Sequence, residues 1–153
     1  MNSFLRKGGH WVVVQNLLTL VVVAVGPIHG AWDRASLWRV PGIVLCAVGA
    51  IFGIAGVRAL GRNLTPFPEP VAEHELVQTG IYRVVRHPLY SSLIFLSFGW
   101  ALAWSSTVTL ALAGGLTLVL DQKSRVEERF LRRRHADYNQ YAQRVRRLIP
   151  GVY

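Results

Sequence analysis

Charged residues are scarce in this sequence, and three long stretches contain none. Asp, Glu, Lys and Arg make up 16% of the 153 residues, against about 25% in soluble domains. All four types are missing from residues 8–32, 40–57 and 87–120. Because a bilayer core about 30 Å thick requires roughly 20 apolar residues per helix, this scarcity excludes an ordinary soluble domain and predicts a polytopic membrane protein.

Cysteine is nearly absent as well. Cys46 is the only one and lies within the second apolar stretch, which excludes a disulfide within the chain and disfavours a thiol nucleophile. Apart from the marginal His29, the predicted spans also lack ionisable residues at mid-membrane. Ion-coupled transporters usually place such residues there, so the sequence disfavours a transporter.

The apolar stretches predict one all-α transmembrane bundle, a single domain covering residues 1–153. The third stretch is too long for one helix, and its polar middle at residues 103–107 predicts a helical hairpin. The predicted spans cover residues 11–29, 40–60, 88–104 and 106–121. Arg6 and Lys7 before the first span would also suit a signal peptide, but no clear cleavage site follows.

The basic residues, which give a net charge of +9, are distributed unevenly. Of the 17 Lys and Arg, Arg34 and Arg39 lie between the first two predicted spans, and the other 15 lie before the first span or in the segments 58–87 and 122–153. Positive charge marks cytoplasmic ends, so we predict that both termini and the site segments 61–87 and 122–153 are cytoplasmic. Juxtamembrane basic residues attract anionic membrane lipid, an interpretation that we favour over nucleic-acid binding.

The second predicted span is rich in glycine. Gly49 and Gly53 form a GxxxG motif, which lets helix backbones approach closely within lipid. We predict that this face packs against another helix of the same chain rather than forming a dimer contact.

The segment 61–87 carries unusual residues. Pro66, Pro68 and Pro70 exclude a continuous helix and predict an extended, turn-rich path. Pro88 suits the first position of the next helix. His87 would then lie beside the unpaired N–H groups of a helix start, which attract anions such as the carboxylate of a methionine moiety.

Aromatic and charged residues accompany these prolines. Tyr82 and Tyr90 could pack against a base or attract a sulfonium through cation–π interaction. The segment after residue 121 predicts an amphipathic C-terminal helix that continues from the fourth span and lies near the headgroups. Lys123 and Glu127 share one face of it. Taken singly, each of these residues also fits an interfacial anchor or a salt-bridged helix surface.

In this order, the motifs resemble the isoprenylcysteine carboxyl methyltransferase and phospholipid methyltransferase superfamily. The motifs that match lie between residues 61 and 150 and are His74-Glu75-Leu76-Val77, Gly80-Ile81-Tyr82, Arg86-His87-Pro88-Leu89-Tyr90, Glu127-Glu128-Arg129-Phe130-Leu131, Tyr138 with Tyr141, and Arg144-Val145 with Leu148-Ile149-Pro150. Two positions depart from the pattern: Lys123 replaces the Arg of the isoprenylcysteine branch, and Arg146 replaces a proline.

The resemblance implies S-adenosylmethionine-dependent methyl transfer at the cytoplasmic membrane face. The acceptor would be a lipidic or isoprenoid-like small molecule, amphipathic, with a carboxylate, thiol or amine. The residues implied to bind the cofactor are His74, Leu76, Val77, Tyr82, His87, Pro88, Tyr90 and Glu127. The residues implied to act on the acceptor are Lys123, Arg125, Glu128 and Arg144.

The type of acceptor stays open at this point. A carboxylate or thiolate needs no base, and Lys123, Arg125 or Arg144 would steer it. An amine or hydroxyl needs a base, for which Glu128 is the nearest candidate. The main alternative to an enzyme is a membrane protein of the same fold that binds lipid or a protein partner without catalysis.

Overall fold

The computed structural model describes residues 4, 7–28, 30, 32, 35–70 and 75–153. Its helices are α2 (Gly9–Val25), α3 (Ala35–Leu60), α4 (Pro88–Ala103), α5 (Thr107–Arg134) and α6 (Tyr138–Arg144), with 3-10 turns at Gly61–Asn63 and Gly80–Arg83. The described residues contain no strand, and the only β-type pairing among them is an isolated bridge between Val85 and Arg146. The predicted all-α class is therefore confirmed.

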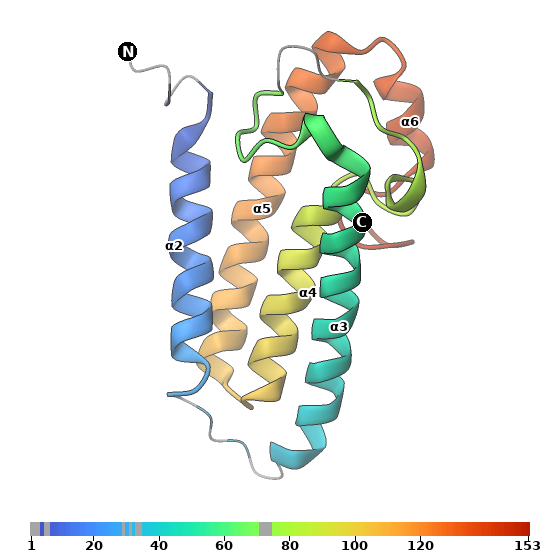
Figure 1. The fold of residues 1–153 in the computed structure, drawn as a ribbon. Coiled ribbons are helices and arrows are strands. Elements are labelled where there is room, and N and C mark those ends of the chain that lie inside the picture. The colour runs from blue at the N-terminus through green and yellow to red at the C-terminus, as the bar shows by residue number, and fades with distance from the viewer. Residues whose placement is uncertain (1–3, 5–6, 29, 31, 33–34, 71–74) are drawn as a thin grey trace.

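Four long helices form a bundle in which successive helices run in opposite directions (Figure 1). α5 packs against α2 and α4, and α4 packs against α3. The turn between α4 and α5 lies at one end of the bundle, and α6 lies at the other (Figure 1). We call the end that carries α6 the polar end, because residues 61–70, 75–87 and 122–149 gather there.

Glycines bring α3 and α4 into close contact. A Cβ added to Gly42 would lie 2.7 Å from the Gly99 carbonyl oxygen, and one added to Gly99 would lie 2.7 Å from the Gly42 carbonyl oxygen. Gly49 and Gly53 of the GxxxG motif face Ser92 in the same way. The prediction that this motif packs within the chain is confirmed, and it fixes α4, whose first turn contributes to the site described below.

The predicted hairpin is confirmed, with its turn at the polar residues 104–106. Ser105 takes a positive φ of 53°, and the Ser106 side chain caps α5 by accepting from the Thr109 N–H at 3.2 Å. α5 then continues past residue 121 without a break, as predicted. The C-terminal helix is not continuous, however, because His135 is extended and ends α5 before α6 begins.

The outer faces of the first two long helices are apolar. Leu17 and Leu20 of α2 and Ile43 and Ile51 of α3 are each more than half exposed. Within the described residues, Ala35–Asn63 is long and apolar enough to cross a bilayer, whereas Gly9–Val25 and Pro88–Ala103 are apolar but shorter. An all-helical bundle that exposes such faces fits a membrane protein.

Candidate active site

A cavity of about 340 Å³ opens at the polar end. α2 supplies one side of the cavity, and the end of α3 with residues of the segment between α3 and α4 supplies a second side. The first two turns of α4, together with α5 and α6, supply the remainder. Its lining is mostly apolar, and the polar or ionisable side chains in it are Gln15, Asn63, Thr65, Tyr82, Arg86, His87, Tyr90, Lys123, Glu127, Tyr138 and Tyr141. A mostly apolar surface on which polar groups converge is typical of a small-molecule site.

Hydrogen bonds from side chains hold the segment that follows α3, which we call the proline segment and which includes Pro66, Pro68 and Glu75. The Asn63 side chain donates to the Glu75 carbonyl oxygen at 3.1 Å and accepts from the Glu75 N–H at 3.2 Å. The Thr65 hydroxyl accepts from the Phe67 N–H at 3.2 Å. These bonds replace the helical pairing that Pro66 and Pro68 prevent, and they hold the segment as a wall of the cavity.

Glu127 is the one carboxylate that lines the cavity among the described residues. Its Oε2 accepts from the Tyr90 hydroxyl at 2.7 Å and lies 3.8 Å from His87 Nδ1. The His87 and Tyr90 rings are stacked, with centroids 5.3 Å apart. Because its described hydrogen-bond donor is a neutral phenol, Glu127 keeps capacity to bind a cation.

Glu128, the next residue, belongs to a separate set of charges that we call the ion network: Arg86, Asp121, Glu128 and Arg147. Glu128 Oε1 accepts from Arg86 Nε at 2.9 Å and from Arg147 Nε at 3.2 Å, and it lies 3.3 Å from His87 Nε2. Burial alone would raise the pKa of Glu128, but the hydrogen bond and charge of His87 and the Arg86 guanidinium lower it well below its usual value.

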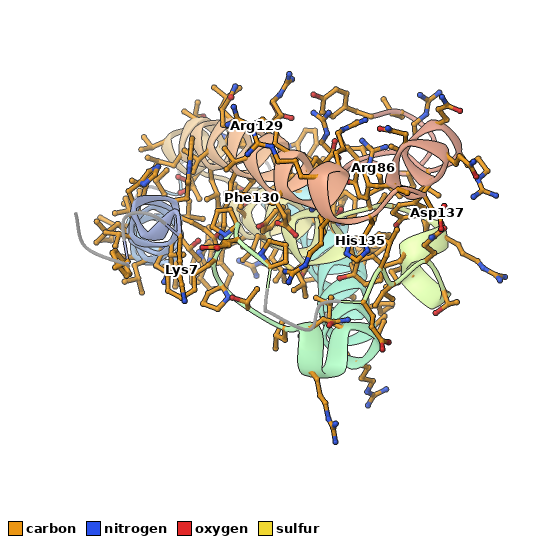
Figure 2. All side chains as sticks on the ribbon, turned by 90° about the horizontal axis from the view of Figure 1, so that it is seen from above. Lys7, Arg86, Arg129, Phe130, His135 and Asp137 are labelled. Atoms are coloured by element: carbon orange, nitrogen blue, oxygen red, sulfur yellow. The ribbon has the colours of Figure 1, made fainter. Side chains whose placement is uncertain are left out.

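The ion network joins α5 to the segment that follows α6. Arg86 donates to the carbonyl oxygens of Ala142 and Val145, and Arg147 Nη1 lies 3.2 Å from Asp121 Oδ1. Figure 2 looks onto the polar end and shows Arg86 among the side chains between α5 and α6, whereas Lys7 lies on the other side beside α2. The network therefore fixes the wall that Glu127 belongs to.

The backbone after α6 also covers the start of α4. The N–H groups of Arg86 and His87 donate to the carbonyl oxygens of Arg146 and Arg147 at 2.8 and 3.1 Å. The Ser91 hydroxyl donates to the Leu148 carbonyl oxygen at 2.5 Å. Arg146 takes part in this contact through its backbone carbonyl, which a proline would also supply. The presence of Arg146 in place of the proline of the family pattern therefore leaves the contact intact.

Lys123 is buried, with 2% of its surface exposed. Its Nζ donates to Gln15 Oε1 of α2 at 2.7 Å and lies 5.2 Å from the centre of the Tyr90 ring. Burial lowers the pKa of the Lys123 ammonium to about 8, and the negative charge of Glu127 acts in the other direction by raising it. Sequence reasoning missed Gln15, although an amide inside an apolar stretch was a signal that could have found it.

Four phenols line the cavity and are called the cavity tyrosines: Tyr82, Tyr90, Tyr138 and Tyr141. The Tyr141 hydroxyl donates to the Tyr82 carbonyl oxygen at 2.7 Å. The Tyr138 hydroxyl is buried, and no hydrogen-bond partner faces it in the described part of the chain. Burial raises the pKa of Tyr82, Tyr138 and Tyr141, so all three are neutral hydrogen-bond donors at physiological pH. Tyr138 lines the cavity with other atoms, and its buried hydroxyl without a described partner is a donor that a ligand would have to reach by a small shift of the wall.

The profile of the phospholipid methyltransferase family matches residues 37–138, about two thirds of the chain. This protein belongs to that family. The match includes most of the cavity wall but neither α2 nor most of α6.

Named relatives fall into two groups. The nickel-cobalt-cadmium resistance protein NccN of Alcaligenes xylosoxydans xylosoxydans is 29% identical over 99% of this chain and 69% of its own length. The cobalt-zinc-cadmium resistance protein CzcN of Cupriavidus metallidurans is 30% identical over 99% and 68%. Protein-S-isoprenylcysteine O-methyltransferase B of Arabidopsis thaliana is 28% identical over 72% of this chain and 58% of its own length. The relatives named as methyltransferases support a membrane methyltransferase of the isoprenylcysteine or phospholipid type.

Most residues that the family resemblance singled out meet at the cavity. Those that line it are Leu76, Val77, Tyr82, His87, Tyr90, Lys123 and Glu127. Pro88 is buried as the first residue of α4 and is not among the lining residues. His74 lies outside the described residues.

The remaining three predicted residues do not line the cavity. Arg125 is exposed and pairs with Asp121 at 2.8 Å. The exposed Arg144 donates to the Gln140 carbonyl oxygen at 3.3 Å. Glu128 is buried in the ion network. Within the described residues, no group of three or more His, Cys, Asp and Glu could hold a metal ion.

Proposed function

We propose that this protein is an S-adenosylmethionine-dependent methyltransferase that methylates an amphipathic acceptor at the cytoplasmic face of a membrane. The observation that carries the proposal is the cavity at the polar end of the apolar bundle. In this member of the family, the cavity is lined by a carboxylate, by stacked rings and by a tyrosine whose buried hydroxyl has no described partner. The acceptor group in this proposal is a carboxylate, a thiol or an amine.

In this proposal α2, α3, α4 and the first half of α5 are four spans, with both termini on the cytoplasmic side of a bacterial inner membrane. The basic residues at the polar end support this orientation. α2 and α4 have 17 and 16 residues, which at 1.5 Å per residue give about 25 Å, so a full crossing requires local bilayer thinning. Membrane lipid would surround the apolar faces.

The residues that line the cavity fit S-adenosylmethionine. Glu127 offers a carboxylate to an ammonium, and the cavity tyrosines offer ring faces to an adenine or a sulfonium. The unpaired Tyr138 hydroxyl can donate to a ribose or carboxylate oxygen. Leu76 and Val77 line the cavity beside these groups and would bind partly through their backbone.

When bound, the cofactor supplies a methyl group on a positively charged sulfur, an electrophile for in-line displacement. The chain contributes position: Tyr90 and His87 fix Glu127, and the ion network fixes the wall behind them. The apolar lining limits water, which favours a transfer that cancels opposite charges. Glu128 accepts from two arginines and has a lowered pKa, so it is poorly suited to act as a base.

Binding of S-adenosylmethionine to protein in nanodiscs, measured by calorimetry, tests this proposal. We expect saturable binding by the wild type and about tenfold weaker binding by Glu127→Gln, since losing one charge-assisted contact costs about 1.4 kcal/mol. His87→Ala should weaken binding as well, because the His87 ring stacks on Tyr90. Glu75→Gln, which removes the charge of an exposed acid in the proline segment, is the matched control and should bind normally.

A folded wild type that binds no cofactor would instead favour the non-catalytic alternative, a membrane protein that binds lipid or a protein partner. Solute flux into liposomes without methyl transfer would favour a transporter.

A further inference from the structure

A second, smaller hollow lies on the surface of α5. It has a volume of about 210 Å³, and in the described part of the chain it is lined by Val126, Arg129, Phe130 and Arg133. We call it the outer groove. None of these four residues lines the cavity. Figure 2 shows Arg129 on the side of α5 that is turned away from α3. The outer groove is therefore a separate feature that lies outside the proposed cofactor site.

The two arginines of the outer groove are exposed and carry unpaired charge. Among the described residues, Arg129 and Arg133 make no ion pair, whereas the neighbouring Arg125 and Arg132 each pair with a carboxylate. Arg129 and Arg133 lie one helical turn apart on α5, so their like charges repel each other. An anion between them would relieve this repulsion, and at such a spacing both guanidinium groups can contact one phosphate.

The remainder of the outer groove is apolar and continues toward the predicted bilayer. Val126 and Phe130 are half-buried. Leu118, Gln122 and Val126 follow one another at four-residue spacing, so they share one face of α5. Leu118 belongs to the predicted fourth span and is 70% exposed, and the exposed amide of Gln122 comes where that span ends. An acyl chain that lies against Leu118 would thus bring its headgroup to the outer groove.

The height of the outer groove fits the headgroup layer, which is about 5 to 8 Å thick on each side of a bilayer. The predicted fourth span ends at residue 121, so at 1.5 Å per residue Val126 and Arg129 lie about 8 and 12 Å beyond it. Side chains on a helix incline toward its N-terminus, which here is the direction of the bilayer. The guanidinium groups of Arg129 and Arg133 can therefore reach back to a lipid phosphate.

We propose that the outer groove binds the headgroup of an anionic phospholipid of the surrounding leaflet. Two unpaired positive charges select a headgroup with net negative charge, because they would repel the ammonium of a zwitterionic headgroup. Phe130 and Val126 would contact the apolar part of the lipid beside the phosphate. The inference goes beyond the proposed function, since this lipid is not the methyl acceptor. Its binding would hold α5, which also carries Glu127, at a fixed height in the bilayer.

Chemical modification of single arginines tests the site. The full chain is placed in nanodiscs of phosphatidylcholine, of phosphatidylcholine with phosphatidylglycerol, and of phosphatidylcholine with inorganic phosphate in the buffer, all at one ionic strength. Phenylglyoxal modifies accessible guanidinium groups, and peptide mass spectrometry gives the rate at each arginine. We expect phosphatidylglycerol to slow the modification of Arg129 and Arg133 about fivefold. It should slow that of Arg144, an exposed arginine at the end of α6, by no more than about twofold.

Variants separate a lipid site from a diffuse attraction to a basic surface. Native mass spectrometry of the detergent-solubilised protein measures the binding of added phosphatidylglycerol. The double variant Arg129→Gln, Arg133→Gln should bind it about tenfold more weakly than Arg144→Gln, Arg146→Gln, which removes the same charge from other exposed positions. Because all four side chains are exposed, the fold should be unaffected. Phe130→Ala keeps every charge and should weaken binding about threefold through the loss of apolar surface.

Equal losses in the two double variants, or undiminished binding by Phe130→Ala, would overturn the inference, because a diffuse attraction depends on charge alone. Protection of Arg129 and Arg133 in phosphatidylcholine alone would overturn the selectivity for an anionic headgroup. Equal protection by inorganic phosphate would leave a site for a free anion instead of a lipid. The variant without Arg129 and Arg133 should still bind S-adenosylmethionine in calorimetry, so the proposed function is tested separately.

Discussion

Two neighbouring acids on α5 divide the polar end into regions of opposite character. Glu128 has 4% of its side chain exposed and accepts from Arg86 and Arg147 in the ion network. Glu127 has 27% of its side chain exposed and accepts from the neutral Tyr90 hydroxyl. In the ion network around Glu128, the charges are paired with one another. In the cavity wall around Glu127, polar groups keep unused hydrogen-bonding capacity.

The difference separates support from recognition. Charges that are already paired hold the first turn of α4, α5 and the segment after α6 in fixed positions. The groups of the cavity wall, among them Lys123 and the Tyr138 hydroxyl, bear a burial cost that a ligand can offset. Damage to the ion network should therefore appear mainly as lost stability, and damage to the wall mainly as lost binding.

The largest expected effect comes from Glu128→Gln. This change leaves Arg86 and Arg147 near a neutral amide in a buried setting, which should lower the free energy of unfolding by about 3 kcal/mol. Glu127→Gln removes the same charge one residue away and should change stability by less than about 1 kcal/mol. Unfolding in a series of SDS–detergent mixtures measures both.

Equal destabilisation by the two substitutions would contradict the division into two regions. A stable Glu128→Gln variant that had lost cofactor binding would contradict it more strongly, because Glu128 would then act as a binding group.

A smaller effect is expected from pH. Since the pKa of Glu128 is lower in the folded protein than its usual value near 4.5, its ionised form contributes stability that is fully present above pH 4.5 and is lost as pH falls. Between pH 4.5 and 3.5 this group alone should remove about 1 kcal/mol from the free energy of unfolding. Thermal unfolding at several pH values measures the slope, which Glu128→Gln should flatten and Glu127→Gln should leave nearly unchanged.

The sequence predicts the helices well because apolar length and charge distribution encode them. The hairpin turn at residues 104–106 and the continuation of α5 into the polar end both follow from that pattern. The break at His135 does not, since the apolar stripe continues across it. The sequence also predicts most of the cavity wall, because the motifs that form the wall flank the predicted spans in the order that the family has.

The sequence could not assign each acid or arginine to its region. Glu127 and Glu128 lie 100° apart around a helix, and only the packing of α5 against its neighbours decides which one faces the cavity. The same packing places Arg125 at the surface and Lys123 in the interior. Gln15 comes from a helix about 108 residues earlier, so no local pattern connects it to Lys123.

The smallest expected effects come from a matched pair of phenols. Tyr141 donates to the Tyr82 carbonyl oxygen, so Tyr141→Phe leaves a buried acceptor unpaired and should cost about 1 kcal/mol of stability. Tyr138→Phe removes a hydroxyl without a described partner and should leave stability unchanged or slightly higher. Thermal unfolding without ligand measures both, and calorimetry with S-adenosylhomocysteine should show about fivefold weaker binding for Tyr138→Phe. If Tyr138→Phe proved the less stable variant and bound normally, its hydroxyl would belong with the paired groups, and the cavity wall would lose the unpaired donor on which its recognition role depends.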